Sequence, residues 1–313
     1  MGVEVGAQRV VGTCLAVKKG ERVLVLADAR TQSIGAALFD AAVAAEAEAV
    51  LALVPPPKEP GEEPTDPLAR MMADCDVVIL ATSQSMTHTA ARRMANRAGA
   101  RIASLPGVTE EMMAEGALTA DYVEIQKATR RLERRLRSAK SVHLTTGAGT
   151  DVTFDVTRRD WVVDDTGICH RRQEMTTLPA GEIFVAPVEG SAEGRLVIDV
   201  TFHTRLAEPA SVVLKEGHAT KVTGAAGAVQ EMNRGGRDGR NFGKFGLGLN
   251  PNARITGNVL ESEKALGAVH VVFGDNAAFG GTVRCGIRVD AILTGATVEV
   301  DGKTIMERGA LNA

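Results

Sequence analysis

Apolar and polar positions in the first 120 residues alternate between short apolar runs and longer amphipathic stretches. The apolar runs, rich in β-branched residues, predict strands buried on both faces at 21–28, 49–54, 76–82 and 101–104. The amphipathic stretches predict helices over 33–47, 87–98 and 109–115, with Ser33 and Thr109 as candidate N-caps. A polar loop is expected up to Pro67. Because strands separated by helices pair in parallel through right-handed crossovers, residues 1–120 are predicted to form an open parallel α/β domain.

The pattern changes after residue 120. Residues 121–140 place apolar positions at helical spacing beneath a basic outer face, which predicts an amphipathic helix joining two domains. From Val142 onward, apolar and polar positions alternate and are interrupted by glycine, Asp-Gly and Asn-Pro turns. Residues 141–313 are therefore predicted to form a strand-rich, mainly antiparallel domain, with a hairpin turn at Asp301 and Gly302. The predicted fold class is α/β plus α+β.

Composition narrows the range of partners. A net charge of −3 gives no electrostatic reason to expect nucleic acid or an anionic membrane, and 3% aromatic residues argue against base stacking. No strand is followed by GxGxxG or GxxxxGK[ST], so no nucleotide cofactor is predicted. The cysteines lie far apart, and we expect reduced thiols. With no signal-peptide pattern and no apolar run of the roughly 18 residues that span a membrane, we expect a cytoplasmic protein.

Candidate chemistry gathers in the second domain, in segments that are otherwise apolar or rich in glycine. Glu182 directly precedes a predicted strand in LPAGEIFVAP, His270 lies inside the apolar strand AVHVVFG, and Asp290 lies in RCGIRVDAIL. Lys244 lies in NFGKFGLGLNP. Burying a carboxylate costs several kcal/mol unless it meets a cation or hydrogen-bond donors. Glu182 and Asp290 are therefore expected to face a metal ion, a basic side chain or water.

Long segments of the chain resemble a known family. They are 178–202 (LPAGEIFVAPVEGSAEGRLVIDVTF), 245–281 (FGLGLNPNARITGNVLESEKALGAVHVVFGDNAAFGG) and the closing RVDAILTGATVEVDGKTI. The segments TTGAGTDVTFDV and SMTHTAARRMANRAGARIASLPGVTEEMM match more weakly. The chain thus resembles the thermophilic metalloprotease family, which contains aminopeptidases T and S, and is most similar to its short branch containing 2,5-dihydroxypyridine 5,6-dioxygenase.

The resemblance implies a set of metal ligands that is incomplete here. The family's aminopeptidases hold two metal ions with two glutamates, two histidines and an aspartate, of which three fall on Glu182, His270 and Asp290. The second glutamate falls on Lys244, and the histidine of the family's His-x-Asp falls on Arg288. The dioxygenase arrangement, two histidines and one carboxylate on Fe(II), also loses a histidine at Arg288. Ammonium and guanidinium groups have no lone pair to give a metal and repel a nearby divalent ion.

Three alternatives follow. In the first, which we prefer, Lys244 pairs with Glu182 and Arg288 pairs with Asp290, and the site works without metal. The cations then stabilise developing negative charge, Asp290 orients them, and His270 or Glu182 is the general base.

In the second alternative, one divalent ion (Fe, Zn or Mn) stays on Glu182, His270 and Asp290, with help from Glu174 or His170. In the third, the site is inactive and has a binding or structural role.

His88 follows the third predicted strand, at the edge where open α/β sheets place ligand-contacting groups. The resemblance implies an acid/base role for it from across an interdomain cleft, and a homodimer. We expect an enzyme that hydrolyses a C–N (amide-like) or related bond in a small polar, possibly heterocyclic, substrate. The alternative is an Fe(II)-dependent ring-cleaving dioxygenase acting on a hydroxylated pyridine-like compound.

Overall fold

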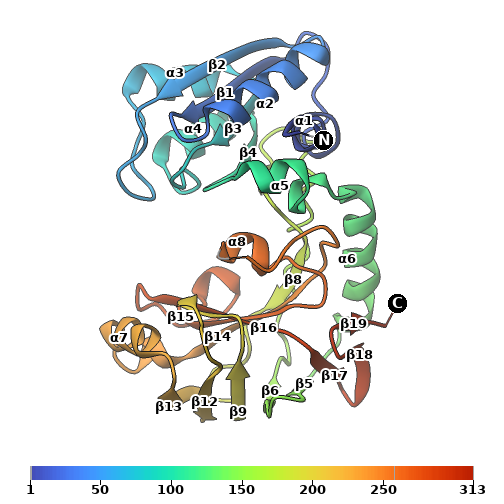
Figure 1. Cartoon of the computed structure of the whole chain (residues 1–313), viewed down its shortest axis with the longest axis vertical. Coiled ribbons are helices and arrows are strands. Elements are labelled where there is room, and N and C mark those ends of the chain that lie inside the picture. The colour runs from blue at the N-terminus through green and yellow to red at the C-terminus, as the bar shows by residue number, and fades with distance from the viewer. Residues whose placement is uncertain (1, 257, 313) are drawn as a thin grey trace. The chain divides into compact units, whose positions relative to one another are not determined.

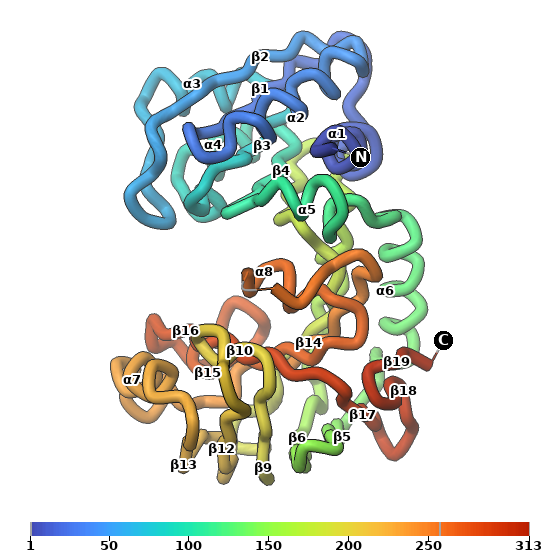
Figure 2. The backbone as a smooth tube through the Cα atoms, viewed as in Figure 1, coloured from blue at the N-terminus to red at the C-terminus, as the bar shows by residue number. Residues whose placement is uncertain are grey.

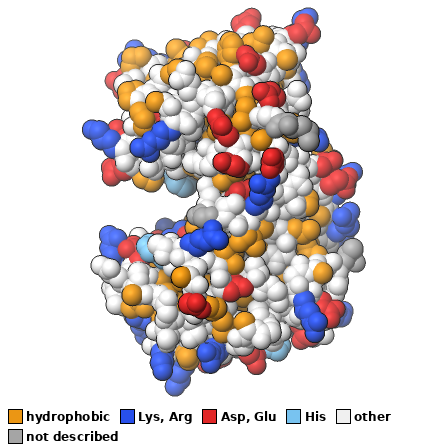
Figure 3. Space-filling model, in the orientation of Figure 1, with side chains coloured by type: hydrophobic (Ala, Val, Ile, Leu, Met, Phe, Trp, Pro, Cys, Tyr) orange, Lys and Arg blue, Asp and Glu red, His pale blue; other side chains and the backbone are white. Residues whose placement is uncertain are grey.

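A computed structural model describes residues 2–256 and 258–312 of the chain. These residues form two compact units (Figures 1 and 2). Unit 1 consists of residues 1–126, 165–180 and 251–253, and unit 2 of residues 127–164, 181–250 and 254–313. The visible surface of each unit mixes acidic and basic side chains (Figure 3), in keeping with the small net charge. In the described part of the chain, no helix has the length and apolar character needed to cross a membrane.

The described residues of unit 1 form a five-stranded parallel sheet in the order β2-β1-β3-β4-β7. Its strands are β1 (Arg22–Asp28), β2 (Glu48–Val54), β3 (Val77–Ala81), β4 (Arg101–Ser104) and β7 (Met175–Thr177). The central strand β3, VVILA, is buried at every position. Continuous apolar runs form these strands because helices cover both faces of a parallel sheet. The predicted open α/β domain is confirmed.

Helical segments connect these strands. They are α1 (Glu4–Gln8), a π-helical turn η1 (Arg9–Cys14), α2 (Gln32–Ala44), α3 (Asp66–Asp74), α4 (Ala90–Ala98), α5 (Glu110–Ala114), η2 (Ala117–Thr119) and α6 (Tyr122–Leu136). The Thr109 side chain caps α5 by accepting a hydrogen bond from the Met112 N–H, as predicted. The prediction for Ser33 is wrong. Helix α2 begins one residue earlier, and the Ser33 hydroxyl instead donates to Glu110 at 2.5 Å.

Two elements of unit 1 differ from the sequence prediction. Helix α3 begins at the end of the segment expected to be a loop and continues through residues for which no element was predicted; Pro67 stands in its first turn, where the missing N–H costs no helical hydrogen bond. Strand β7 comes from the chain beyond residue 141, yet it pairs in parallel with β4 and extends the sheet of unit 1. The chain therefore passes from unit 1 to unit 2 within α6, returns at residue 165 and leaves again at 181.

Unit 2 contains, among its described residues, two antiparallel sheets. The six-stranded sheet has the order β11-β10-β16-β15-β14-β8 and the eight-stranded sheet has the order β13-β12-β9-β6-β5-β17-β18-β19. The first comprises β8 (Glu182–Val185), β10 (Thr201–Phe202), β11 (Thr204–Arg205), β14 (Phe242–Gly248), β15 (Val269–Gly274) and β16 (Arg288–Leu293). The second comprises β5 (Ser141–Thr146), β6 (Asp151–Asp155), β9 (Glu193–Ile198), β12 (Ala210–Lys215), β13 (His218–Thr223), β17 (Ala296–Val300), β18 (Lys303–Glu307) and β19 (Ala310–Leu311).

The remaining helical segments of unit 2 are short. They are α7 (Ala226–Arg234), η3 (Asp238–Arg240), α8 (Val259–Ser262) and η4 (Ala277–Phe279). The predicted hairpin joins β17 to β18, and Asp301 and Gly302 have φ of 49° and 74°, the left-handed region that an Asp-Gly turn tolerates. One apolar core lies against both sheets of unit 2. Both the strand-rich character and the antiparallel pairing predicted for this part are confirmed.

Candidate active site

One face of the six-stranded sheet carries charged side chains, and the other face joins the apolar core. Alternation along each strand produces this division, because successive side chains of a strand point to opposite faces. In β8, Ile183 and Val185 enter the core, so Glu182 lies on the opposite face. In β14, Phe245 and Leu247 enter the core in the same way. The neighbours of these core residues form the charged face.

Strand pairing aligns the charged residues. Lys244 of β14 and Asp290 of β16 both pair with Val272 of β15. Paired residues of an antiparallel ladder share a face, and His270 shares it too because it lies two residues from Val272. Arg288 lies two residues before Asp290 and pairs with Gly274. The register of three strands therefore places a lysine, a histidine, an arginine and an aspartate on one surface.

A loop that contains α8, the orange segment near β8 in Figure 1, brings side chains into contact with this charged face. It approaches β14 so closely that a Cβ on Gly248 would lie 2.1 Å from the Ala265 carbonyl oxygen. Only glycine permits this approach, which brings Glu263 and Lys264 down onto the sheet. The residues that meet here are called the charged cluster; they are Glu182, Lys244, Glu263, Lys264, His270, Arg288 and Asp290.

Ammonium groups occupy one side of the two glutamates. The Nζ atoms of Lys244 and Lys264 each lie 2.8 Å from Oε1 of Glu182. Lys264 also lies 3.0 Å from Oε1 of Glu263, so its ammonium bridges the two carboxylates. The side chains of Lys244, Lys264 and Glu182 are at most 4% exposed. Charges buried this deeply are tolerated only when paired, and the shared contacts supply that pairing.

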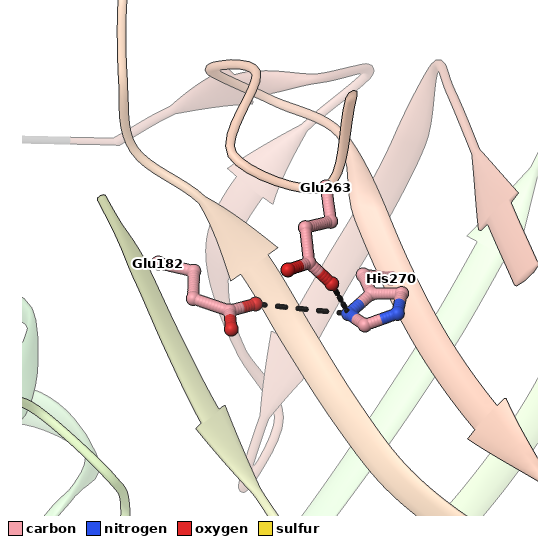
Figure 4. Close-up of side chains that lie close together, drawn as sticks. All are labelled: Glu182, Glu263 and His270. Atoms are coloured by element: carbon pink, nitrogen blue, oxygen red, sulfur yellow. Dashed lines mark ion pairs between the residues drawn. The ribbon is translucent and has the colours of Figure 1, made fainter. Parts of the chain in front are cut away.

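The other side of the same glutamates faces the ring of His270 (Figure 4). Its Nδ1 lies 2.9 Å from Oε2 of Glu263 and 3.6 Å from Oε2 of Glu182. Across the described residues, none of these buried atoms makes a hydrogen bond of regular geometry. An unsatisfied buried polar atom costs about 1–3 kcal/mol, so these atoms together require a positively charged partner.

Asp290 settles which nitrogen of His270 carries a proton. Oδ1 of Asp290 lies 2.9 Å from Nε2, and an ionised carboxylate only accepts, so Nε2–H donates to it. The same oxygen accepts from Nε and Nη2 of Arg288 at 3.1 and 2.9 Å. A neutral ring would then turn the lone pair of Nδ1 toward the carboxylates of Glu182 and Glu263. A second proton on Nδ1 removes that repulsion.

The electrostatics agree with a protonated ring. Burial alone would lower the pKa of His270, but the Glu263 carboxylate beside it raises that pKa to about 9. Burial would raise the pKa of the Glu182 carboxyl, yet Lys244 and Lys264 hold it well below the usual range. Burial likewise opposes ionisation of Asp290, and Arg288 keeps its pKa low. The carboxylates of Glu182 and Asp290 are therefore ionised at neutral pH, and the ring of His270 is protonated.

Aromatic rings border the cationic side of the cluster. Nζ of Lys244 lies 3.9 Å from the ring centroid of Phe184 and 5.9 Å from that of Phe279. The two rings meet edge to face, with centroids 5.3 Å apart. The guanidinium carbon of Arg288 also lies 5.9 Å from the Phe279 centroid. Cation–π contact stabilises a desolvated ammonium, and of the two rings Phe184 is buried and Phe279 is partly exposed.

The structure brings together Glu182, Lys244, His270, Arg288 and Asp290, all predicted from the sequence. Both ion pairs of the metal-free alternative are present, Lys244 with Glu182 and Arg288 with Asp290. The single-metal alternative paired Asp290 with Glu182 and His270. The ligand atoms that converge instead belong to Glu182, Glu263 and His270.

The other predicted residues lie in unit 1. His88 is exposed, in the turn before α4, and its role stays a prediction. Nε2 of His170 lies 2.8 Å from the Thr13 carbonyl oxygen. The carboxylate of Glu174 accepts hydrogen bonds from the backbone N–H groups of His170 and Arg171. These contacts tie down the loop before β7, and a role for His170 or Glu174 as a metal ligand stays a prediction.

Glu263 and Lys264 were missed from the sequence. They lie in the block that carries the family resemblance, but a Glu-Lys pair after a short amphipathic segment looks like an exposed turn. A signal was available in the neighbouring glycines. GLGLNP places a glycine on the charged face of β14, where a second segment can approach the backbone.

The sequence and the fold of this chain both match known proteins. Residues 7–313 match the model of the 2,5-dihydroxypyridine 5,6-dioxygenase family. The chain belongs to this family. A search of curated protein sequences gave no significant match.

Two solved structures share the fold. The 2,5-dihydroxypyridine dioxygenase from Pseudomonas putida KT2440 is 21% identical, with a TM-score of 0.78 over 99% of this chain and 97% of that one. Wild-type AmpT from Thermus thermophilus is 17% identical, with a TM-score of 0.72 over 99% of both chains. The dioxygenase family and the aminopeptidase-like fold predicted from the sequence are thus both supported.

A metal ion is what the dioxygenase family implies for this site. Glu182, Glu263 and His270 bring ligand atoms within 4.8 Å of one another, a group that can hold one ion. The charges around it do not suit a divalent ion. Lys244 and Lys264 already hold Glu182, and two unit charges about 4 Å apart repel by about 4 kcal/mol in a protein environment. A proton on His270 fills the same place at half that charge, so the residues present fit a proton and not a divalent ion.

Proposed function

We propose that this protein opens the ring of a small hydroxylated, pyridine-like compound, which it binds as an anion at the charged cluster, with dioxygen as the second substrate. Family membership supports the reaction class, because the family is named for cleavage of 2,5-dihydroxypyridine between ring positions 5 and 6. The similar structure from Pseudomonas putida carries the same activity in its name. Neither fixes the substrate of this chain.

The observation that carries the proposal is the positive charge buried in the cluster. Lys244, Lys264 and Arg288 lie within contact distance of the carboxylates of Glu182, Glu263 and Asp290, so three cationic side chains converge on one place in unit 2. Cationic groups that are fixed in a site with little water stabilise a negative charge placed beside them, so they favour an anionic ligand. Ring hydroxyls next to a nitrogen heterocycle supply such an anion once they ionise.

Each part of the cluster has a role in this proposal. Lys244, which lies against the Phe184 ring, would bind the ionised hydroxyl. Arg288, whose side chain is 44% exposed, would meet the substrate where the cluster reaches solvent. His270 would transfer a proton, and Asp290 would orient its ring through Nε2.

The reaction balances without an external reductant. The carbon–carbon bond of the ring breaks, and each of its two carbons takes one atom of dioxygen. All electrons gained by dioxygen come from the ring. The proton lost when the hydroxyl ionises returns to the opened product.

Hydrolysis of a C–N bond is the second candidate. Its support is the similarity in fold to AmpT and the pair of ammonium groups on Glu182, which can polarise a carbonyl group beside a carboxylate base. In this reaction the water oxygen, and no atom of dioxygen, enters the product.

Isotope labelling separates the two. The protein is incubated with 2,5-dihydroxypyridine and related hydroxypyridines under ¹⁸O₂, with a sample lacking protein to correct for autoxidation. Uptake of both labelled atoms and equimolar oxygen consumption support ring cleavage. Turnover of an amide analogue in the absence of oxygen, with label entering only from H₂¹⁸O, would favour the hydrolase. No turnover of either class contradicts the proposal.

A further inference from the structure

We infer that this chain works without a divalent metal ion, and that the ammonium groups of Lys244 and Lys264 supply the positive charge that the ion would have given. The inference uses the proposed function only for the class of substrate, an oxyanion. It departs from the family resemblance, which implies metal ligands at positions 244 and 288.

The position of Lys244 in the sheet holds its ammonium inside the charged cluster. Its register opposite Val272 sets its side chain on the same face as His270, where the resemblance places a glutamate ligand. The side chain is 2% exposed, and its Nζ lies between Oε1 of Glu182 and the Phe184 ring. The ammonium is therefore fixed by two contacts, rather than free to swing away and admit an ion.

The ammonium of Lys264 bridges the two glutamates. Its Nζ lies 2.8 Å from Glu182 and 3.0 Å from Glu263, each time at Oε1. A divalent ion between two carboxylates takes the bridging position that this ammonium occupies. An ion bound by the Oε2 atoms of Glu182 and Glu263 would share both carboxylates with Lys264, whose ammonium would repel it. On the side away from His270, the Oε1 atoms of both glutamates thus already pair with ammonium groups.

Asp290 is not available as a metal ligand either. Oδ1 of Asp290 accepts from two nitrogens of Arg288 and from Nε2 of His270. Nη2 of Arg288 also lies 3.9 Å from Oε2 of Glu263. The guanidinium therefore lies beside the carboxylates of both residues. The substitutions at 244 and 288 act together, since each places a fixed cation beside a carboxylate that a metal would need.

The chemical consequence is a direct reaction between the ionised ring and dioxygen. The fixed cations stabilise the ionised substrate and the negative charge that develops on dioxygen as the ring gives up its electrons. Each of the two ring carbons gains one oxygen atom as the bond between them breaks. The same cations would serve the hydrolytic candidate by stabilising an oxyanion on a carbonyl.

The test measures metal content, so its outcome does not depend on turnover. The unmodified protein is produced in medium supplemented with iron, zinc and manganese and purified without chelator. We expect the metal content to stay far below one equivalent, and one tightly held equivalent of any of these ions overturns the inference. This arm requires no variant.

A double variant, Lys244→Glu with Arg288→His, tests whether these two residues exclude the ion. We expect it to hold about one equivalent of metal per chain, at least a tenfold increase over the unmodified protein, with a melting temperature that rises on addition of that ion. The matched control, Lys221→Glu with Arg205→His, makes the same changes at exposed positions of unit 2 and should bind none. If the folded double variant gains no metal, Lys264→Met is added to it, and a folded triple variant that still gains none overturns the inference. The single variant Lys244→Glu replaces it if the double variant does not fold.

Discussion

Two buried ion-pair systems in this protein differ in whether they are closed. In unit 1, Arg101 and Glu21 form a bidentate pair with N···O distances of 2.9 and 2.7 Å, and Nε of Arg101 donates to the Leu15 carbonyl oxygen. One guanidinium meets one carboxylate, and the donors and acceptors match. In unit 2, the charged cluster shares cations among several carboxylates and leaves Oε2 of Glu182 and Oε2 of Glu263 without a regular hydrogen bond within residues 2–256 and 258–312.

The difference separates a structural role from a binding role. A closed pair gains from its own geometry and needs no further partner, since the fork of an arginine matches a carboxylate. A cluster in which several cations share several carboxylates can instead exchange one of these contacts for a contact with a ligand. Perturbed carboxylates and histidines of this kind gather at functional sites more often than in structural pairs.

The largest effect that distinguishes the two systems is expected at Lys244. In Lys244→Met, a chain of similar length loses the ammonium that faces the developing negative charge, and turnover should fall by about 10²–10³-fold. The measurement is kcat and KM with the hydroxypyridine that the unmodified protein turns over best. Lys221→Met, at an exposed position of the same unit, serves as the control and should keep the full rate. A loss of less than about threefold in kcat/KM, which corresponds to under 1 kcal/mol, would assign Lys244 a structural role.

Arg101 should give the opposite result. In Arg101→Met, Glu21 loses its bidentate partner and the Leu15 carbonyl oxygen loses a donor, so the free energy of unfolding should drop by about 1–3 kcal/mol. Urea denaturation measures this loss, and turnover by the folded fraction should stay unchanged. If Arg101→Met abolishes activity while stability stays at the parent level, the assignment of this pair to structure is wrong.

The smallest effect is expected at Glu189, which is intermediate between the two systems. Burial would raise the pKa of its carboxyl, but the Thr282 N–H, the Asn276 amide and Arg159 lower that pKa to about 2. A carboxyl whose folded pKa lies below its unfolded value of about 4.3 stabilises the fold above pH 4.3, and this stabilisation is lost as the pH falls toward 2.

Glu189→Gln should therefore flatten the melting temperature as a function of pH between about 4.3 and 2, while the unmodified protein loses stability across that range. Differential scanning calorimetry at a series of pH values measures both curves. Parallel curves would show that the carboxylate of Glu189 makes no net contribution.

The sequence predicted the strands and the face of the six-stranded sheet that carries charge, because alternation fixes which side chains share a face. It did not predict that Glu263 and Lys264 join that face. They arrive through a loop whose path depends on contacts between Gly248 and Ala265, which are distant from any periodic pattern. Helix α3 was not predicted because Pro67, in its first turn, is typical of a loop. Strand β7 was not assigned to the parallel sheet because it comes after the linking helix in the chain. Local rules thus supplied the elements, whereas tertiary contacts completed the cluster.

In the proposed reaction, fixed cations of the charged cluster stabilise the negative charge that a metal ion would otherwise stabilise. The deciding experiment measures oxygen uptake with the hydroxypyridine that the protein turns over best, before and after exhaustive dialysis against EDTA. We expect the same rate in both samples and no increase on addition of Fe(II). A rate that disappears after dialysis and returns with Fe(II) would contradict it.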